Sequence, residues 1–181
     1  TQMIVKGHDF PNVTLVGVLA ADMSLYTGDY RSGERTFQLL TQAAGRAGRG
    51  ERPGEAVIQT YDHSHYAIET AAAQDYEAFY EEEIRYRELM GYPPAEQLLA
   101  VLISGGDEAL LEKGCYYLKE YILRVIRKIS PEETAARVIG PASPGIDKIK
   151  DVYRRVIYIK AEKYETLTGI KDRVEQYIEI I

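Results

Sequence analysis

Apolar and polar positions over residues 1–60 follow a strand–helix–strand rhythm. Residues 13–20 form a continuous apolar run rich in β-branched side chains, which predicts a strand buried on both faces of a parallel sheet. Residues 34–49 carry apolar side chains along one face and predict a helix, and residues 55–60 predict a second short, buried strand. This order is typical of half a doubly wound α/β domain. Asp22 follows the first strand, at the edge where such sheets bind ligands.

The rest of the chain predicts a helical segment and then a second, α+β unit. Residues 65–90 have helical spacing and stop at the turn of residues 91–94, where we place a domain boundary. Beyond it the expected order is β-α-β-β-α, one strand short of a split βαβ, ferredoxin-like sandwich. The expected elements are a strand at 97–103, a helix at 108–129, a short strand at 137–140, a strand at 152–161 and a helix at 164–181.

Composition and charge are those of a globular protein without a membrane span. The chain has 181 residues, of which 45% are hydrophobic and 28% charged, and no run of about 18 apolar residues occurs. The first residues lack the layout of a signal peptide, so a cytoplasmic location is expected. The net charge of −6 argues against a wholly basic nucleic-acid coat but allows a local basic groove. The single cysteine, Cys115, is expected to be a buried core residue.

One glutamine and two arginines stand at fixed offsets within residues 42–49, with glycines between them. They are Gln42, Arg46 and Arg49. Charge builds up on phosphate oxygens during phosphoryl transfer, and guanidinium groups stabilise it with rigid, charge-assisted hydrogen bonds. The pattern therefore predicts phosphate chemistry. The alternative is a solvated helix end that carries surface arginines.

Together with Gly45 and Gly48, these residues fill all five positions of Q-x-x-G-R-x-G-R, and the segment resembles motif VI of superfamily 2 helicases. Residues 1–11, with the strand that follows, resemble motif V, although the glycine that should precede Thr1 is missing. The resemblance implies three sets of site residues. They are Gln42, Arg46 and Arg49 in ATP hydrolysis; Gly7, Asp9 and Gly45 beside the nucleotide; and Thr1 and Lys6 on DNA.

Further segments extend the resemblance over nearly the whole chain, to the primosomal protein N′ family of replication-restart helicases. The segments are residues 7–16, 29–35, 53–55, 59–60, 92–94 and 140–142. The resemblance implies an α/β fold in three parts. Residues 1–60 would end the second RecA-like helicase lobe, residues 61–94 would form a helical connector, and residues 95–181 would form a C-terminal α+β domain that lacks its last strand.

By the same resemblance, the chain is the C-terminal part of an ATP-dependent 3′-to-5′ DNA helicase that restarts stalled forks and helps assemble the primosome. The implied partners are forked or single-stranded DNA, the single-stranded DNA-binding protein and other primosome proteins, with no membrane. The chain has no G-x-x-x-x-G-K-[ST] loop and no Asp-Glu-x-His stretch. ATP and Mg²⁺ are therefore expected only in the parent protein, zinc only in its upstream part, and no ATPase activity in this fragment.

Other parts of the chain leave alternatives open. Lys148, Lys150, Arg154 and Arg155 are the one local basic cluster, and they predict DNA contact or, equally well, a solvated strand edge. Arg31 and Arg35 are expected either to face DNA or nucleotide or to form a salt-bridged loop. His63 and His65 are more typical of loop histidines than of a metal pair.

Two other functions remain as alternatives for the chain. It could be a DNA- or partner-binding module without motor activity. It could also belong to a different superfamily 2 helicase, such as a RecQ- or RecG-like enzyme, although the segments outside motifs V and VI argue against that.

Overall fold

The computed structural model describes residues 12–48, 52–129 and 136–180, and the chain divides into two compact units. The first unit comprises residues 1–86 and the second residues 87–181. The first contains a small parallel sheet and the second an antiparallel one, which confirms the α/β expectation in its coarse form. The finer division into helicase lobe, connector and C-terminal domain stays a prediction. No helix in the described parts is long and apolar enough to cross a membrane.

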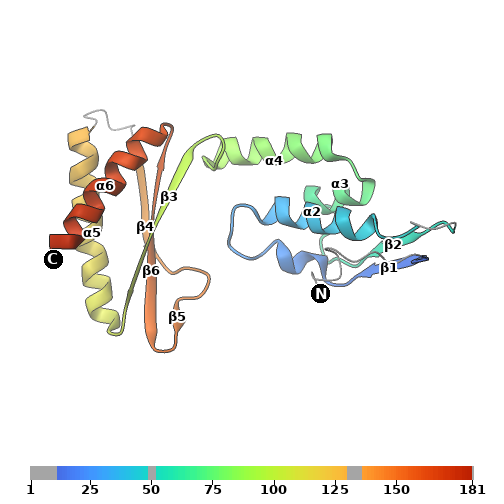
Figure 1. The fold of residues 1–181 in the computed structure, drawn as a ribbon, viewed down its shortest axis with the longest axis horizontal. Helices are drawn as coiled ribbons and strands as arrows, with labels where there is room; N and C mark the ends of the chain where they lie inside the picture. Colours follow the sequence, from blue (N-terminus) through green and yellow to red (C-terminus); the bar gives the residue numbers. More distant parts are fainter. Residues whose placement is uncertain (1–11, 49–51, 130–135, 181) are drawn as a thin grey trace. The chain divides into compact units, whose positions relative to one another are not determined.

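In the first unit, one helix covers a two-stranded parallel sheet (Figure 1). Strand β1 (Leu15–Val18) pairs with β2 (Glu55–Ile58), and helix α2 (Ser32–Ala44) connects them after the short 3-10 helix η1 (Ala21–Ser24). Helix α3 (Tyr66–Ala73) follows β2. The core of this unit lies between the helices and includes Leu25, Phe37, Leu40, Ala67, Ile68, Ala71 and Phe79.

The expectation that β1 is buried on both faces is wrong for the described structure. Leu15 is 61% exposed, Leu19 79% and Val57 of β2 51%. Val18 and Ile58 do pack against the core. A run of apolar side chains indicates a strand whose two faces favour burial. Whether both faces are buried depends on how many other elements pack on the sheet. Here the described elements cover one face.

The predicted helix over residues 65–90 is two helices. Helix α3 ends at Ala73, and Gln74, which follows it, has a left-handed backbone (φ 55°). Asp75 then accepts a hydrogen bond from the amide of Ala78 at 3.0 Å, which caps helix α4 (Tyr76–Met90). Phe79 of α4 stacks on Phe37, with ring centroids 4.2 Å apart.

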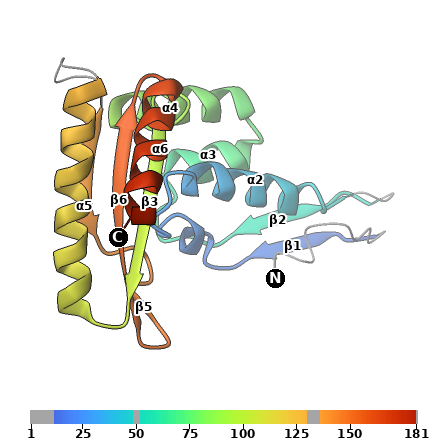
Figure 2. The same ribbon diagram turned by 60° about the vertical axis from the view of Figure 1, so that its left-hand side comes forward.

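The second unit is an antiparallel sheet with both helices on one face (Figures 1 and 2). Its strand order is β3-β6-β4, so β6 lies between two strands that helix α5 connects, and β5 forms a hairpin with β6. The elements are β3 (Gln97–Gly105), α5 (Glu108–Ile129), β4 (Arg137–Ala142), β5 (Lys148–Ile149), β6 (Val152–Ala161) and α6 (Tyr164–Ile180).

The core of the second unit lies between this sheet and its two helices. Ile122 and Val125 of α5 and Ile170 of α6 meet Ile157 and Ile159 of β6. Cys115 is fully buried on α5, as its helical spacing predicts, and burial raises the pKa of its thiol. A thiol in that state is a packing residue and not a nucleophile.

A buried lysine ties the start of the second unit to its central strand. Lys160 of β6 donates to the carbonyl of Met90 at 2.8 Å, and its ammonium lies 3.7 Å from the centre of the Tyr92 ring. Burial lowers its pKa. The amides of Gly91 and Tyr92 bond back to the carbonyls of Glu88 and Arg87, which closes the last turn of α4.

Candidate functional site

The glutamine–arginine segment lies at the C-terminal end of α2. Gln42 is in the last turn of the helix. The helix ends at Ala44, whereas the sequence predicts that it continues to residue 49. The amide of Arg46 then bonds to the carbonyl of Ala43 at 3.0 Å, and that of Ala47 to Ala44 at 3.1 Å, so the chain leaves the helix through a tight turn. Gln42 and Gly45 are exposed and Arg46 is half-buried.

Two glycines fix the path of this segment. Gly48 has a left-handed backbone (φ 74°), and its amide donates to the carbonyl of Val13, beside β1, at 2.9 Å. Gly54 passes so close that a Cβ there would lie 2.0 Å from the nitrogen of Gly48 and 2.4 Å from the carbonyl carbon of Ala47. The arginine segment is therefore packed backbone to backbone against the turn that leads into β2.

Several predicted site residues lie outside the described residues. They are Thr1, Lys6, Gly7, Asp9 and Arg49. Their roles stay predictions from the resemblance. Among the predicted catalytic and nucleotide residues, the structure brings together Gln42, Gly45 and Arg46 on one helix end and its turn.

Asp22 lies at the carboxyl end of β1, as predicted, but its carboxylate already has partners. It accepts hydrogen bonds from the Thr60 hydroxyl, from the amide of Tyr61 at 2.9 Å and from the amide of Asp62 at 3.1 Å. The Thr60 hydroxyl, followed by the Tyr61 amide, lowers the pKa of Asp22 to about 2. Three donors from residues 60–62 therefore hold this carboxylate, which joins the ends of the two strands.

Replacing Asp22 by asparagine is expected to remove an acid-sensitive part of the stability of the first unit. The folded-state pKa is depressed, so the contribution is complete above about pH 4 and is lost as pH falls toward 2. Thermal unfolding between pH 2 and 5 should show a smaller loss for Asp22→Asn than for the wild type. Asp62→Asn in the same loop is the control, and equal acid sensitivity of Asp22→Asn and wild type would contradict the prediction.

Arg31, Arg35 and His65, whose roles the sequence leaves open, interact with residues close to them in the sequence. Asp29 forms an ion pair with Arg35 at 2.7 Å and accepts a hydrogen bond from the amide of Arg31 at 3.0 Å, which is the salt-bridged loop alternative. Nδ1 of His65 accepts a hydrogen bond from the amide of Ala67 at 3.2 Å and caps α3. Within the described residues, His63 and His65 belong to no group of three metal-ligating side chains.

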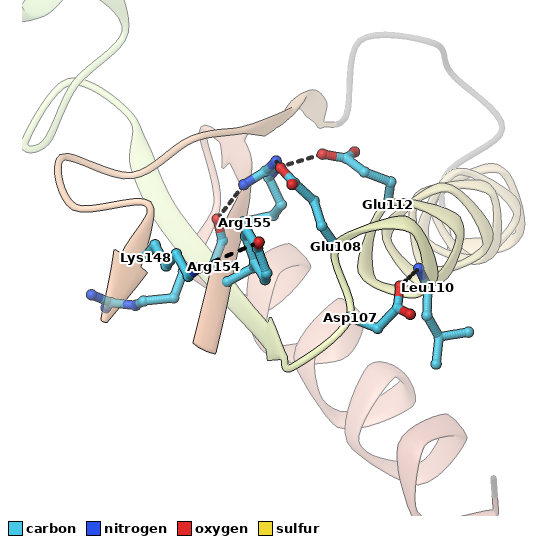
Figure 3. A network of polar contacts seen from close by, with 8 residues as sticks. Asp107, Glu108, Leu110, Glu112, Lys148, Arg154 and Arg155 are labelled. Carbon is cyan, nitrogen blue, oxygen red and sulfur yellow. Dashed lines mark hydrogen bonds and ion pairs between the residues drawn. The ribbon is translucent and has the colours of Figure 1, made fainter. Parts of the chain in front are cut away.

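The residues of the predicted basic cluster in the second unit have different partners within the protein. Figure 3 shows Arg155 turned toward α5, where its guanidinium meets two glutamates. Nε lies 2.5 Å from Glu112 and Nη2 lies 2.9 Å from Glu108. Glu112, followed by Glu108, raises the pKa of Arg155, whose side chain is largely buried. This geometry favours a structural role for Arg155.

The other three basic residues lie on the β5–β6 hairpin. Lys148 pairs with Asp151 at 3.0 Å and sits over the Tyr153 ring, and Asp151 followed by Tyr153 raises its pKa. The side chain of Arg154 lies on the opposite face of the strand from that of Arg155, and its guanidinium donates to the carbonyl of Ile146 at 3.5 Å. Lys150 is exposed at the turn.

Sequence reasoning missed the residues that hold these sites in place. Gly54 carried a signal, since Pro-Gly marks a turn, but its contact with Gly48 needs the fold. Glu108 and Glu112 are one helical turn apart, yet nothing in the sequence connects them to a residue more than 40 positions away.

Comparison with known proteins places the chain in a family. Residues 88–179 match the family described as "Primosomal protein N C-terminal domain". The chain is similar to "Replication restart protein PriA" of Bacillus subtilis (42% identity over 98% of this chain and 21% of that protein) and of Synechocystis (38% over 97% and 20%). The same-named protein of Borreliella burgdorferi is 30% identical over 99% of this chain and 26% of that protein.

This chain thus spans about a fifth to a quarter of the length of these relatives. The resemblance to the primosomal protein N′ family, first read from the segments between residues 7 and 142, is confirmed by the family match and by the identity along nearly the whole chain. The chain belongs to the primosomal protein N family, and residues 88–179 are its match to the C-terminal domain of that family.

Proposed function

We propose that this chain is the C-terminal part of an ATP-dependent 3′-to-5′ DNA helicase that restarts stalled replication forks and helps assemble the primosome. The carrying observation is the position of Gln42 and Arg46 at the end of α2, in a segment that the Gly48–Gly54 contact holds in one path. Relatives named as replication restart proteins support the biological role.

In this proposal, residues 1–60 end the second RecA-like lobe and residues 95–181 form a ferredoxin-like domain without its last strand. The exposed apolar side chains of β1 and β2 support the first part, because they need cover from further elements of a larger sheet. A β-strand inserted between two strands that a helix connects, as in β3-β6-β4, supports the second.

The arginines of residues 42–49 would stabilise the charge on the γ-phosphate of ATP, which the parent protein holds with Mg²⁺. An arginine of this kind contributes about 10³–10⁵ in rate. The chain contains no phosphate-cradling loop. Its own residues therefore supply the arginines of the site, and the chain alone hydrolyses no ATP. Zinc belongs to the upstream part of the parent. We place the parent in the cytoplasm, with the single-stranded DNA-binding protein and other primosome proteins as partners.

Strand displacement tests the proposal. The full-length parent, given ATP and Mg²⁺, should release the short strand of a partial duplex with a 3′ single-stranded tail and leave the 5′-tailed duplex intact. A non-hydrolysable ATP analogue should give no release. Failure to separate either duplex while ATP is hydrolysed would reject the helicase assignment.

The second candidate function is a DNA-binding module formed by the second unit. The exposed basic side chains of the β5–β6 hairpin favour it. In this case the 181-residue chain alone should bind forked DNA without ATP, and log K should fall linearly with log salt concentration. Binding that is absent at low salt would reject this candidate.

A further inference from the structure

The tip of the β5–β6 hairpin exposes branched aliphatic side chains beside basic ones. Ile146 is 60% exposed, Ile149 44% and Val152 41%. Ile149 and Val152 form the last pair of the hairpin, and the two residues between them, Lys150 and Asp151, both have left-handed backbones (φ 47° and 62°). This is the pattern of a type I′ turn, which gives a narrow hairpin end.

The base of the hairpin is anchored to α5. Arg155 follows Arg154 on β6 and binds both Glu108 and Glu112, as Figure 3 shows. The amide of Arg154 also bonds across to the carbonyl of Asp147 at 2.7 Å. Two effects follow from the Arg155 contacts. The hairpin has a fixed base, and the guanidinium offsets part of the negative charge of two carboxylates that would otherwise repel an anion nearby.

We infer that this hairpin contacts the single-strand/double-strand junction of a forked DNA, an inference that rests on the proposed function. Lys150 and Arg154 bind phosphates on the two sides of the junction, because phosphate attraction needs only cations at suitable spacing. Ile149 and Val152 lie against the last base pair, as aliphatic side chains do when they wedge against a base step. Arg155 is a positioning residue that holds the hairpin and touches no DNA.

The aliphatic contact is tested with a fork that carries 2-aminopurine at the first paired position. Binding of the 181-residue chain should raise its fluorescence by unstacking that base. Ile149→Thr with Val152→Thr keeps β-branched residues in the hairpin and should lose most of the rise while Kd changes less than about threefold. Ile178→Thr, at an isoleucine of α6 that is 55% exposed, is the control. A full fluorescence rise with the threonine pair would overturn the inference.

The phosphate contacts are tested by salt titration. Lys150→Gln and Arg154→Gln should each reduce the slope of log K against log salt by about 0.9, the loss of one phosphate contact. Lys163→Gln, which removes an exposed lysine before α6, should leave the slope unchanged. Unchanged slopes in both hairpin variants would place the phosphates elsewhere.

The role of Arg155 is tested by rescue. Arg155→Gln should weaken fork binding about tenfold, because it uncovers Glu108 and Glu112 beside the hairpin. Adding Glu108→Gln and Glu112→Gln should bring Kd back to within about twofold of the wild type. If the triple variant stays weak while its thermal unfolding matches the wild type, Arg155 itself binds phosphate and the positioning role is wrong.

These outcomes separate the inference from the proposed function. A chain that binds forks with a steep salt slope, unaffected by every hairpin substitution, overturns the hairpin inference alone. A chain that binds no fork at any salt concentration overturns DNA contact by this unit altogether. A hairpin needed only to retain an acidic protein partner also overturns the inference.

Discussion

Arg49→Ala in the full-length parent is expected to lower kcat for DNA-dependent ATP hydrolysis by about 10³-fold or more, with little change in the Kd for DNA. Arg49 follows Gly48, whose amide is fixed to the carbonyl of Val13. A guanidinium delivered from that turn would meet the γ-phosphate only as charge develops on it. Its loss should therefore act on the transition state, and less on substrate binding.

Two further variants make this result specific. Arg49→Lys keeps the charge but loses the planar fork of donors, so it should recover little of the rate. Arg52→Ala removes an exposed arginine three residues further on, outside the signature, and should hydrolyse ATP normally. An Arg49→Ala protein as active as the Arg52→Ala control would show that the arginine segment does not serve the ATP site.

Gly54→Ala is expected to lower the stability of the first unit by about 2–3 kcal/mol. The added Cβ would lie 2.0 Å from the nitrogen and 2.6 Å from the Cα of Gly48. Both are backbone atoms, and no side chain can turn away to make room. The chain must separate the arginine segment from β2, which breaks the contact that defines its path.

Hydrogen exchange of the amides in α2 is the appropriate measurement, because it reports the stability of this unit separately. Exchange in Gly54→Ala should speed up by about 30- to 150-fold, the equivalent of that free energy. Gly17→Ala, where nothing lies within 4 Å of the added Cβ, should exchange as the wild type does. Equal exchange in the two variants would contradict the close approach.

Strongly periodic elements could be predicted from the sequence. Helix α5 and strand β6 have the predicted bounds, because each combines a clear apolar face with a definite start. Asp107 supplies that start for α5, since its carboxylate accepts a hydrogen bond from the amide of Leu110 at 2.8 Å. The break between α3 and α4 was missed because Gln74 is an ordinary helix former, yet here it is left-handed, and the amides of Gln74 and Asp75 bond back to the carbonyls of Ala71 and Thr70.

Contacts between distant residues could not be predicted in the same way. The basic cluster of residues 148–155 looks continuous in sequence, yet strand alternation turns Arg155 toward α5 and Arg154 away from it. Asp22 emerged correctly at a sheet edge, but its partners come from residues 60–62 and satisfy it internally. Sequence patterns identify side chains that could bind a ligand, whereas the fold decides which of them are already paired within the protein.

The most direct test of the central claim is DNA-dependent ATP hydrolysis, measured side by side for the 181-residue chain and for its full-length parent. The claim is that this chain supplies the arginine side of an ATP site and no phosphate-binding side. It predicts hydrolysis that DNA stimulates in the parent and none above background in the chain. DNA-stimulated hydrolysis by the chain alone would contradict it.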